Sequence, residues 1–172
     1  MDETAIRKLV DGLISAWNDR DIDRMLSYLD ESVIWDDPAM LVGPAKGKRA
    51  VLEFSKNILQ AFPDFSFRIR APVCIARSGD YCTIPWEITA THTGPFGPLG
   101  LAPTNQTIKM LGVDFVEIKD AKIARIETYF NVMPALEQAL RLKPLRKSSV
   151  GLAIMIWIQR WLAFWLRRAT NK

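Results

Sequence analysis

The residue with the clearest chemical potential is Asp114, an acid within the otherwise apolar stretch 106–118. Strand side chains alternate between two faces, so Asp114 shares its face with apolar residues: Ile108, Met110, Val116 and Ile118. The other face carries Leu111, Val113 and Phe115, which indicates a strand that is buried on both faces or lines a cavity. Burial disfavours an ionised carboxylate and raises its pKa. Asp114 is therefore either a structural aspartate bonded to backbone N–H groups or a functional acid.

The sequence offers few residues for metal or nucleophilic chemistry. It contains one histidine and two cysteines, with no Cys-x-x-Cys or His-Glu-x-x-His pattern, so we expect no metal site. We expect no cofactor, because a glycine-rich phosphate loop and a nucleophile elbow are both absent from the sequence. Cys74 and Cys82 flank a predicted turn at 78–80 and could face each other across a hairpin. Because the N-terminus is acidic and amphipathic, unlike a secretory signal, we expect free thiols.

Charge is distributed unevenly along the chain. Residues 1–140 contain 15 basic and all 19 acidic residues, a net charge of −4, whereas residues 141–172 contain eight basic residues and no acidic ones. The pI of about 9.2 is therefore a property of the C-terminal segment. We expect no binding to nucleic acid, and we divide the chain into a domain over 1–142 and a basic segment over 143–172.

The elements that must position Asp114 follow from hydrophobic periodicity. Apolar residues at helical spacing predict a helix over 3–18, a short helix capped by Asp21, a third over about 48–61 and a closing helix over 134–142. Alternation predicts a short strand over 32–37 that ends at Pro38, and long strands over 65–77, 81–93, 106–118 and 122–132. This order indicates an α+β fold, with a curved antiparallel sheet wrapped over three helices around a conical cavity.

Several motifs in this order resemble the NTF2-like superfamily, in particular its branch of SnoaL-like polyketide cyclases and ketosteroid isomerases. The motifs are Trp17-Asn18-Asp19-Arg20-Asp21, Tyr28-Leu29-Asp30-Glu31-Ser32, Trp35-Asp36-Asp37-Pro38, Thr91-His92-Thr93-Gly94, Ala102-Pro103-Thr104-Asn105, Val113-Asp114-Phe115 and the run from Lys122-Ile123 to Tyr129-Phe130-Asn131. The resemblance covers about residues 3–142 and implies the NTF2-like cone, a fold that contains both enzymes and non-catalytic binding modules.

The resemblance implies roles for two acids. Asp37 matches the general base of ketosteroid isomerases, and Asp114 matches the acid that those enzymes hold protonated in apolar surroundings. SnoaL-like cyclases similarly use the acid of that strand as general acid/base. The tyrosine that completes the isomerase oxyanion hole falls at Leu13, which has no hydroxyl, so we do not expect steroid isomerase activity itself.

Two carboxyl groups with different pKa values can divide the roles of base and acid. We expect Asp37, at a strand end near a loop, to be ionised and Asp114 to hold its proton. Such a pair suits proton abstraction next to a carbonyl, as in isomerisation and aldol-type ring closure. We therefore expect a cofactor-free isomerase or cyclase acting on a hydrophobic carbonyl compound. The alternative is a non-catalytic module that binds a lipophilic small molecule or serves as a subunit of a membrane-associated complex.

Six further residues are candidates for contact with the ligand: Trp17, Trp35, Trp86, His92, Met110 and Tyr129. The tryptophans are ordinary core aromatics unless they converge on Asp114, whose strand face also carries Met110. His92 lies on the core face of its strand, as a hydrogen-bonded structural residue or as a ligand contact. Tyr129 could donate its phenol and partly replace the missing tyrosine.

The basic segment 143–172 predicts an amphipathic helix from Ser148 or Ser149 to about residue 168. Arg160 and Arg167 fall in its narrow polar sector. Tryptophans recur at steps of four and are not expected to remain in water: Trp157, Trp161 and Trp165. The apolar stretch of 17 residues, with an arginine near its middle, is unsuited to span a bilayer.

This pattern favours a helix that lies in a membrane interface or docks on a membrane-protein complex. We therefore expect a cytoplasmic protein that is peripheral at a membrane. The alternative is that the helix packs on its own domain or on a second copy in a homodimer, since dimers are common in the superfamily that the chain resembles.

Deletion of residues 145–172 is expected to leave a folded protein that no longer associates with membranes or detergent, because the predicted domain closes by residue 142. Vesicle co-sedimentation at low and high salt measures this. Binding of the full chain to anionic vesicles should weaken as salt rises, because salt screens the basic residues. If the truncated domain unfolds or loses a dimer, and the full chain ignores anionic vesicles, the helix belongs to the fold or to the dimer.

Overall fold

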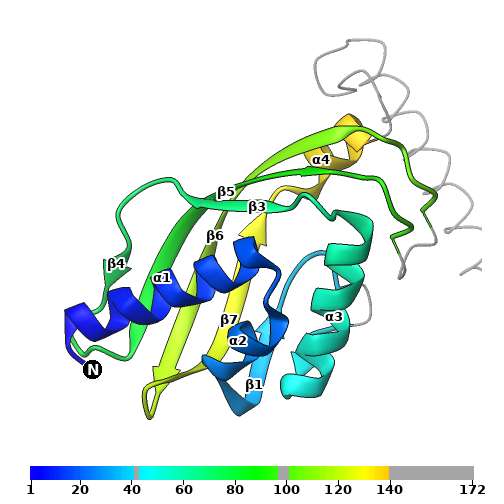
Figure 1. Ribbon diagram of the computed structural model, residues 1–172. Coiled ribbons are helices and arrows are strands. Elements are labelled where there is room, and N and C mark those ends of the chain that lie inside the picture. The colour runs from blue at the N-terminus through cyan, green and yellow to red at the C-terminus, as the bar shows by residue number, and fades with distance from the viewer. Residues whose placement is uncertain (41–42, 97–100, 140–172) are drawn as a thin grey trace, which may run out of the picture. The chain divides into compact units, whose positions relative to one another are not determined.

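The computed structural model describes residues 1–40, 43–96 and 101–139 (Figure 1). The predicted helix that carries Trp157, Arg160, Trp161, Trp165 and Arg167 lies outside the described residues, as does the predicted end of the closing helix at 142. Within the described part of the chain, no helix is both long enough and apolar enough to cross a membrane.

Four helices form close to the predicted positions: α1 (Glu3–Asp19), α2 (Ile22–Ser27), α3 (Lys48–Ala61) and α4 (Val132–Ala139). The side chain of Asp2 accepts the Ala5 N–H at the start of α1, and Asp21 caps α2 as predicted by accepting the Arg24 N–H. Helix α4 begins before the predicted Pro134, because a proline in the first turn removes no helical hydrogen bond.

The strands are β1 (Leu29–Asp36), β2 (Ala45–Lys46), β3 (Ser66–Ile69), β4 (Cys74–Ile75), β5 (Tyr81–Thr91), β6 (Thr107–Lys119) and β7 (Lys122–Phe130). The single strand predicted over 65–77 is wrong, because this stretch forms the two short strands β3 and β4. Pro72 lies between them and has no N–H to donate to the sheet. Both short strands pair antiparallel with β5.

The sheet has the order β2-β1-β7-β6-β5-β3, and β4 also pairs with β5. Every pair is antiparallel except β1 with β7, which is parallel. The sheet is therefore mixed rather than purely antiparallel. The parallel pair joins the first strand of the chain to the last, and so it brings the end of β1 beside β7.

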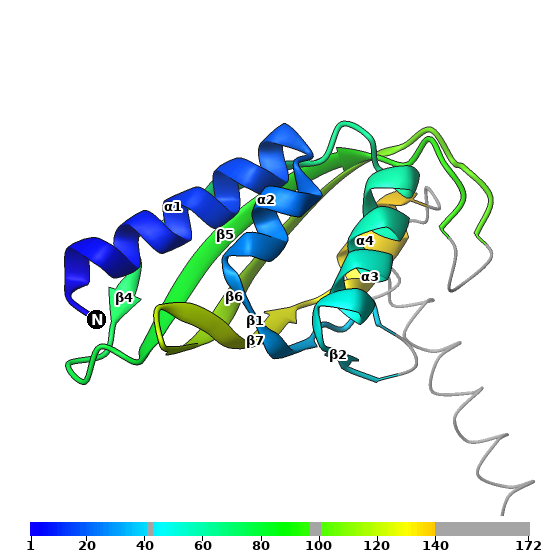
Figure 2. The same ribbon diagram turned by 60° about the horizontal axis from the view of Figure 1, so that its bottom comes forward.

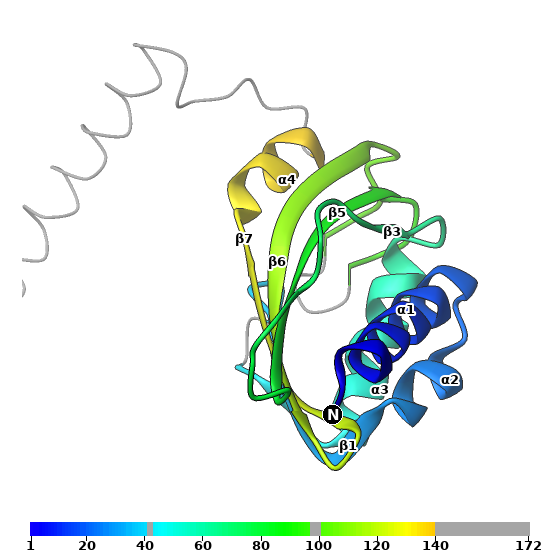
Figure 3. The ribbon, with the colours of Figure 1, turned by 90° about the vertical axis from the view of Figure 1, so that its left-hand side faces the viewer.

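The sheet curves around three helices. Figure 3 shows the strands from the side, with α1, α2 and α3 on the concave face, and Figure 2 shows α1 and α2 lying along it. The core lies between these layers and includes Ile6, Val10, Leu29, Val33, Ile84, Trp86, Val116, Ile123 and Ile126. Helix α4 packs against β6, where the Gln138 side chain accepts the Lys109 N–H and donates to the Lys109 carbonyl.

The concave and convex faces of β6 differ sharply. Ile108, Asp114, Val116 and Ile118 are buried on the concave face, whereas Leu111 and Phe115 on the other face are each 47% exposed. Burial on both faces is therefore wrong for this strand, and the alternative of a cavity-lining strand is confirmed. Apolar outer residues do not by themselves imply burial, because much of any protein surface is apolar.

The two cysteines are free thiols, as predicted. The register of β4 and β5 pairs Cys74 with Thr83 and Cys82 with Ile75, so the cysteines are not directly opposite each other. Cys82 is buried and Cys74 is exposed.

One side chain connects α1 to the edge of the sheet. Asn18 donates from Nδ2 to the Phe67 carbonyl at 2.8 Å and accepts the Phe67 N–H at Oδ1 at 2.7 Å. Both backbone groups of Phe67 are thus satisfied by one amide, which positions the Phe67 ring toward the concave face.

Asn18→Ala is expected to destabilise the protein by about 1–3 kcal/mol, because it leaves two partly buried backbone groups without partners. Denaturant unfolding measures the change. Lys8→Ala, at an exposed position on the same helix, is the matched control and should change stability by less than about 0.5 kcal/mol. Equal effects of the two substitutions would show that the Asn18 bonds do not stabilise the fold.

Candidate active site

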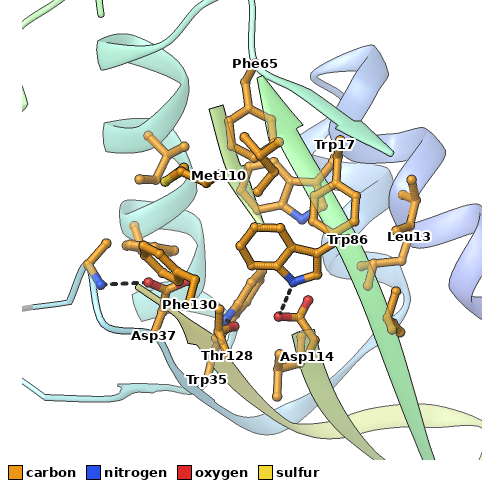
Figure 4. Close-up of a pocket in the computed structure, with 18 residues that line it drawn as sticks. Leu13, Trp17, Trp35, Asp37, Phe65, Trp86, Met110, Asp114, Thr128 and Phe130 are labelled. Atoms are coloured by element: carbon orange, nitrogen blue, oxygen red, sulfur yellow. Dashed lines mark hydrogen bonds between the residues drawn. The ribbon is translucent and has the colours of Figure 1, made fainter. Parts of the chain in front are cut away.

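A small cavity of about 80 Å³ lies between the concave face of the sheet and helices α1 and α3 (Figure 4). Asp37 and Asp114 both line it. Trp17 comes from α1, Trp35 from β1, Trp86 from β5 and Met110 from β6, so four of the six predicted contact residues converge here. Most of the remaining lining is aliphatic or phenylalanine, and Leu13 contributes no hydroxyl. The cavity is therefore an apolar space with two acids in its lining.

Asp114 is the most deeply buried acid in this lining, with 6% of its surface exposed. Its Oδ1 accepts a hydrogen bond of 2.9 Å from the Trp86 indole Nε1–H, and no backbone N–H bonds to it among the described residues (Figure 4). Asp114 is therefore held by side chains, unlike the structural aspartate considered from the sequence. The direct cross-strand neighbour of Asp114 is Thr128 on β7.

Thr128 is a site residue that the sequence analysis did not identify. Its Oγ1 accepts the Trp35 indole N–H at 3.1 Å, which leaves its own O–H to donate toward Asp114. Alternation along β7 could have identified it, because Ile126, Thr128 and Phe130 share the concave face.

Burial raises the pKa of Asp114 from its ordinary value to about 7. The hydrogen bonds of Trp86 and Thr128 favour the charged form and oppose this rise, and the negative charge of Asp37 adds to it. The predicted direction is therefore correct. At neutral pH about half of the Asp114 carboxyls carry a proton.

Asp37 follows β1 and is half-buried, with its Oδ1 accepting the Ala39 N–H at 2.7 Å (Figure 4). Burial raises its pKa to about 6, the Ala39 N–H lowers it, and the charge of Asp36 raises it. Asp37 is therefore mainly ionised at pH 7, as expected, although its pKa lies above the ordinary value. The two acids thus have pKa values in the expected order.

Gly112 lets Trp86 reach Asp114, and the sequence analysis missed it. The two residues are directly opposite in the β5–β6 pair, and a Cβ on Gly112 would lie 2.3 Å from Trp86 Cζ2. Because glycine has no side chain, the indole can lie across β6 and donate to Asp114 two residues further along. A glycine within a strand often marks such a close approach.

Two predicted contact residues lie elsewhere. Tyr129 is 56% exposed on the convex face and bonds to Glu127, so its predicted contribution to the pocket is wrong. The reason is strand alternation, since its neighbours Thr128 and Phe130 face the cavity. His92 is buried on the concave face, as predicted, but lines a second cavity beneath α4. In the described residues no group of three or more His, Cys, Asp or Glu side chains is placed to hold a metal.

The raised pKa of Asp114 makes a prediction about stability. Between about pH 4 and pH 7 the folded protein retains a proton on Asp114 that the unfolded chain has released. Its contribution to stability is therefore fully present below about pH 4 and is lost as pH rises through 7. Asp114→Asn cannot titrate, so the stability of the wild type relative to this variant should fall with pH, by up to about 1.4 kcal/mol per unit.

Denaturant unfolding of the two proteins from pH 4 to pH 8 measures this difference. Asp114→Ala should cost more stability than Asp114→Asn at every pH, because the amide retains an acceptor for the Trp86 N–H. A carboxyl NMR titration that places Asp114 near pH 4 would contradict the prediction.

Gly112→Ala is expected to displace the Trp86 indole and to cost about 1–3 kcal/mol of stability, because the added methyl overlaps the ring. The indole N–H signal of Trp86 in NMR reports the hydrogen bond to Asp114 directly. Leu111→Ala, on the exposed face of the same strand, should leave that signal unchanged. An unchanged signal in Gly112→Ala would remove the positioning role of Gly112.

Comparison with known proteins places this site in a family. The family model of SnoaL-like polyketide cyclases matches residues 7–139. No curated protein gives a match. A candidate polyketide cyclase from Xanthomonas campestris pv. campestris is similar in structure, with a TM-score of 0.70 and 22% identity over 79% of this chain and 97% of that one.

Two further structures share the fold at lower identity. A candidate SnoaL-like polyketide cyclase from Jannaschia sp. CCS1 has a TM-score of 0.69 and 16% identity, covering 83% of this chain and 94% of its own. SalBIII, an epoxide hydrolase/cyclase-like enzyme in pyran ring formation in the polyether salinomycin, has a TM-score of 0.65 and 16% identity, covering 77% and 95%. The curved sheet with its enclosed helices is the NTF2-like cone, and the chain belongs to the SnoaL-like polyketide cyclase family.

Proposed function

We propose that this protein is a cofactor-free isomerase or cyclase that acts on a hydrophobic carbonyl compound, with Asp37 as the general base and Asp114 as the general acid. The observation that carries this proposal is the presence of both carboxyls in the lining of one apolar cavity. Their raised pKa values, about 6 and about 7, are close to the working pH, where general acid–base groups are most effective.

The proton transfers follow from the state of each acid. Ionised Asp37 takes a proton from the carbon next to the carbonyl, and the electron pair of that C–H bond moves toward the oxygen to form an enolate. Protonated Asp114 donates a hydrogen bond to this oxygen from its carboxyl O–H, while its Oδ1 still accepts the Trp86 N–H. Isomerisation returns a proton to another carbon, whereas ring closure forms a C–C bond to a second carbonyl whose oxygen is then protonated.

The apolar lining supports this assignment. Low polarity strengthens the electrostatic interaction between the acid and the developing negative charge. SalBIII shares the fold and also takes part in ring closure, although its pyran ring closes through a C–O bond rather than the C–C bond proposed here. Leu13 lies in the lining at the position that resembles the ketosteroid isomerase tyrosine, so this position offers the enolate no hydroxyl donor.

A non-catalytic pocket is the alternative, and the size of the cavity favours it. A volume of about 80 Å³ is well below the roughly 300–1,000 Å³ of typical ligand pockets. A ligand must therefore displace side chains, of which the unbranched Met110 is the most adaptable. In this case the two acids would only hydrogen-bond to the ligand.

Attachment of the chain to a membrane surface or membrane-protein complex is a separate proposal. Its support is the sequence of residues 143–172, which is basic, rich in tryptophan and without acidic residues. A lipophilic substrate would be concentrated at such a surface, so attachment and an apolar pocket are consistent with each other. A homodimer is the competing use of the same segment.

Exchange of carbon-bound protons tests the chemistry without knowledge of the natural substrate. With 2-tetralone in D₂O, the protein should accelerate exchange at the carbons next to the carbonyl, as measured by NMR. Asp37→Asn should lower the accelerated rate by about 10²–10⁴-fold, because the base is lost. The same substitution should change stability by no more than about 1 kcal/mol.

Asp36→Asn is the matched control, since Asp36 is the exposed neighbour of Asp37 and does not line the cavity. It should exchange 2-tetralone protons at close to the wild-type rate, because it removes only the smallest of the influences on the pKa of Asp37. Full activity in Asp37→Asn would exclude Asp37 as the base, and 2-tetralone that binds to the protein but does not exchange would favour the non-catalytic alternative.

A further inference from the structure

A second cavity of about 140 Å³ lies beneath α4, between that helix, α3 and the inner face of the sheet. Its lining is apolar, with Phe62, Met110, Phe130 and Leu136 among its members. Among the described residues of this lining, His92 alone carries a nitrogen or oxygen atom in its side chain. The described part of the lining therefore places one polar group in apolar surroundings.

The His92 ring is buried and held in place, with 2% of its surface exposed. Its Nδ1 lies 3.2 Å from Thr104 Oγ1, and its ring packs on Phe62 with centroids 5.2 Å apart. Its Nε2 has no hydrogen-bond partner among the described residues. Buried polar atoms are nearly always paired, and an unpaired one costs about 1–3 kcal/mol. This atom therefore points to a missing partner.

The missing partner must be able to bond to Nε2 in either tautomer of the His92 ring. If Nδ1–H donates to Thr104, Nε2 is an acceptor, and if the Thr104 hydroxyl donates to Nδ1, Nε2–H is a donor. A hydroxyl group both donates and accepts, so it satisfies both forms. The rest of the described lining is apolar, so a neutral group is favoured over a charged one, which His92 alone could pair.

The volume of the cavity limits the size of the ligand that it can hold. An apolar cavity of about 150 Å³ holds one benzene molecule, so this cavity has room for one six-membered ring. We infer that it holds a hydroxyl-bearing ring of the ligand, with the hydroxyl bonded to His92 Nε2. His92 is then a residue that determines specificity rather than a catalytic residue.

The two cavities are neighbours, because four residues line both: Ala39, Ile58, Met110 and Phe130. A rotation of the Met110 side chain toward either space would open this shared boundary. A ligand with its hydroxylated ring beneath α4 could then extend its carbonyl toward Asp37 and Asp114. The position of the ligand's carbonyl near the two acids rests on the proposed function. The hydroxyl site beneath α4 does not depend on that function. The substrate class is thus a lipophilic ring compound with a hydroxyl distant from the reacting carbonyl.

Two matched probes, 4-methylphenol and toluene, test the hydroxyl site, since they differ only in the hydroxyl. His92 is the only histidine in the sequence, so the ¹⁵N signals of its ring are unambiguous in a protein without a histidine tag. Titration of the full chain with 4-methylphenol should shift the Nε2 signal of His92 and the methyl signal of Met110. Toluene should bind at least about tenfold more weakly, because it leaves Nε2 unpaired.

His92→Phe retains a ring against Phe62 but removes both nitrogen atoms. It should weaken binding of 4-methylphenol by about tenfold and leave the affinity for toluene unchanged or higher. Leu111→Ala is the control and should bind 4-methylphenol as the wild type does, because Leu111 lies on the exposed face of β6 and lines neither cavity.

Three results would overturn the hydroxyl site: an unchanged Nε2 signal, equal binding of the two probes, or full affinity for 4-methylphenol in His92→Phe. If that variant does not fold, the titration of the wild type decides alone. Failure of the proposed chemistry is separate, because it appears as absent exchange of 2-tetralone protons while binding of 4-methylphenol still depends on His92.

Discussion

The structure depends on the burial of one carboxyl group in an apolar core. Asp114 lies on the inner face of the central strand, where an unsupported charge would be costly. Its support is a set of side chains on neighbouring strands, with the Trp86 indole on one side and the Thr128 hydroxyl on the other. These two side chains depend on two further residues. Gly112 leaves room for the Trp86 ring because it has no side chain, and Trp35 orients Thr128 by donating a hydrogen bond to it. The pKa of Asp114 is therefore close to neutral pH, where the carboxyl can either hold or release its proton.

The same arrangement fixes two walls of the first cavity. The Trp35 and Trp86 indoles line it and are each held by an N–H bond, to Thr128 and to Asp114. The space between them is small, and its neighbour beneath α4 is larger. A ligand larger than these volumes therefore requires side-chain movement, for which Met110 and Phe130 on the shared boundary are well placed.

Proton transfer between carbon and oxygen is suited to a site of this kind. It needs one ionised and one protonated group in an apolar environment, and it needs no redox partner. Members of this fold vary the chemistry by changing the lining of the cone while keeping its shape, so the fold alone does not define the reaction. In this chain the informative features are Leu13 in place of a hydroxyl donor and the His92 Nε2, which has no partner among the described residues.

The sequence by itself determined the elements and the inward face of the main strands. Helices α1 and α3 were predicted to within a residue, because their apolar stripes repeat over several turns. Alternation along β5 correctly separated buried Ile84, Trp86 and Ile88 from their neighbours. The same rule placed Asp114 inward. The family resemblance, which rests on short motifs, supplied the cone and the pairing of Asp37 with Asp114.

Tertiary structure decided what depends on partners distant in sequence. The parallel pairing of β1 with β7 follows from packing across the whole domain, and so does the burial of Asp37, which a loop position did not suggest. The role of Gly112 could be recognised only from the structure, which places Trp86 directly opposite it. Tyr129 was assigned to the wrong face, because a motif match gave its type but not its orientation. Local periodicity reports which face of an element is apolar, whereas cross-strand register and cavity shape arise from contacts that no local window contains.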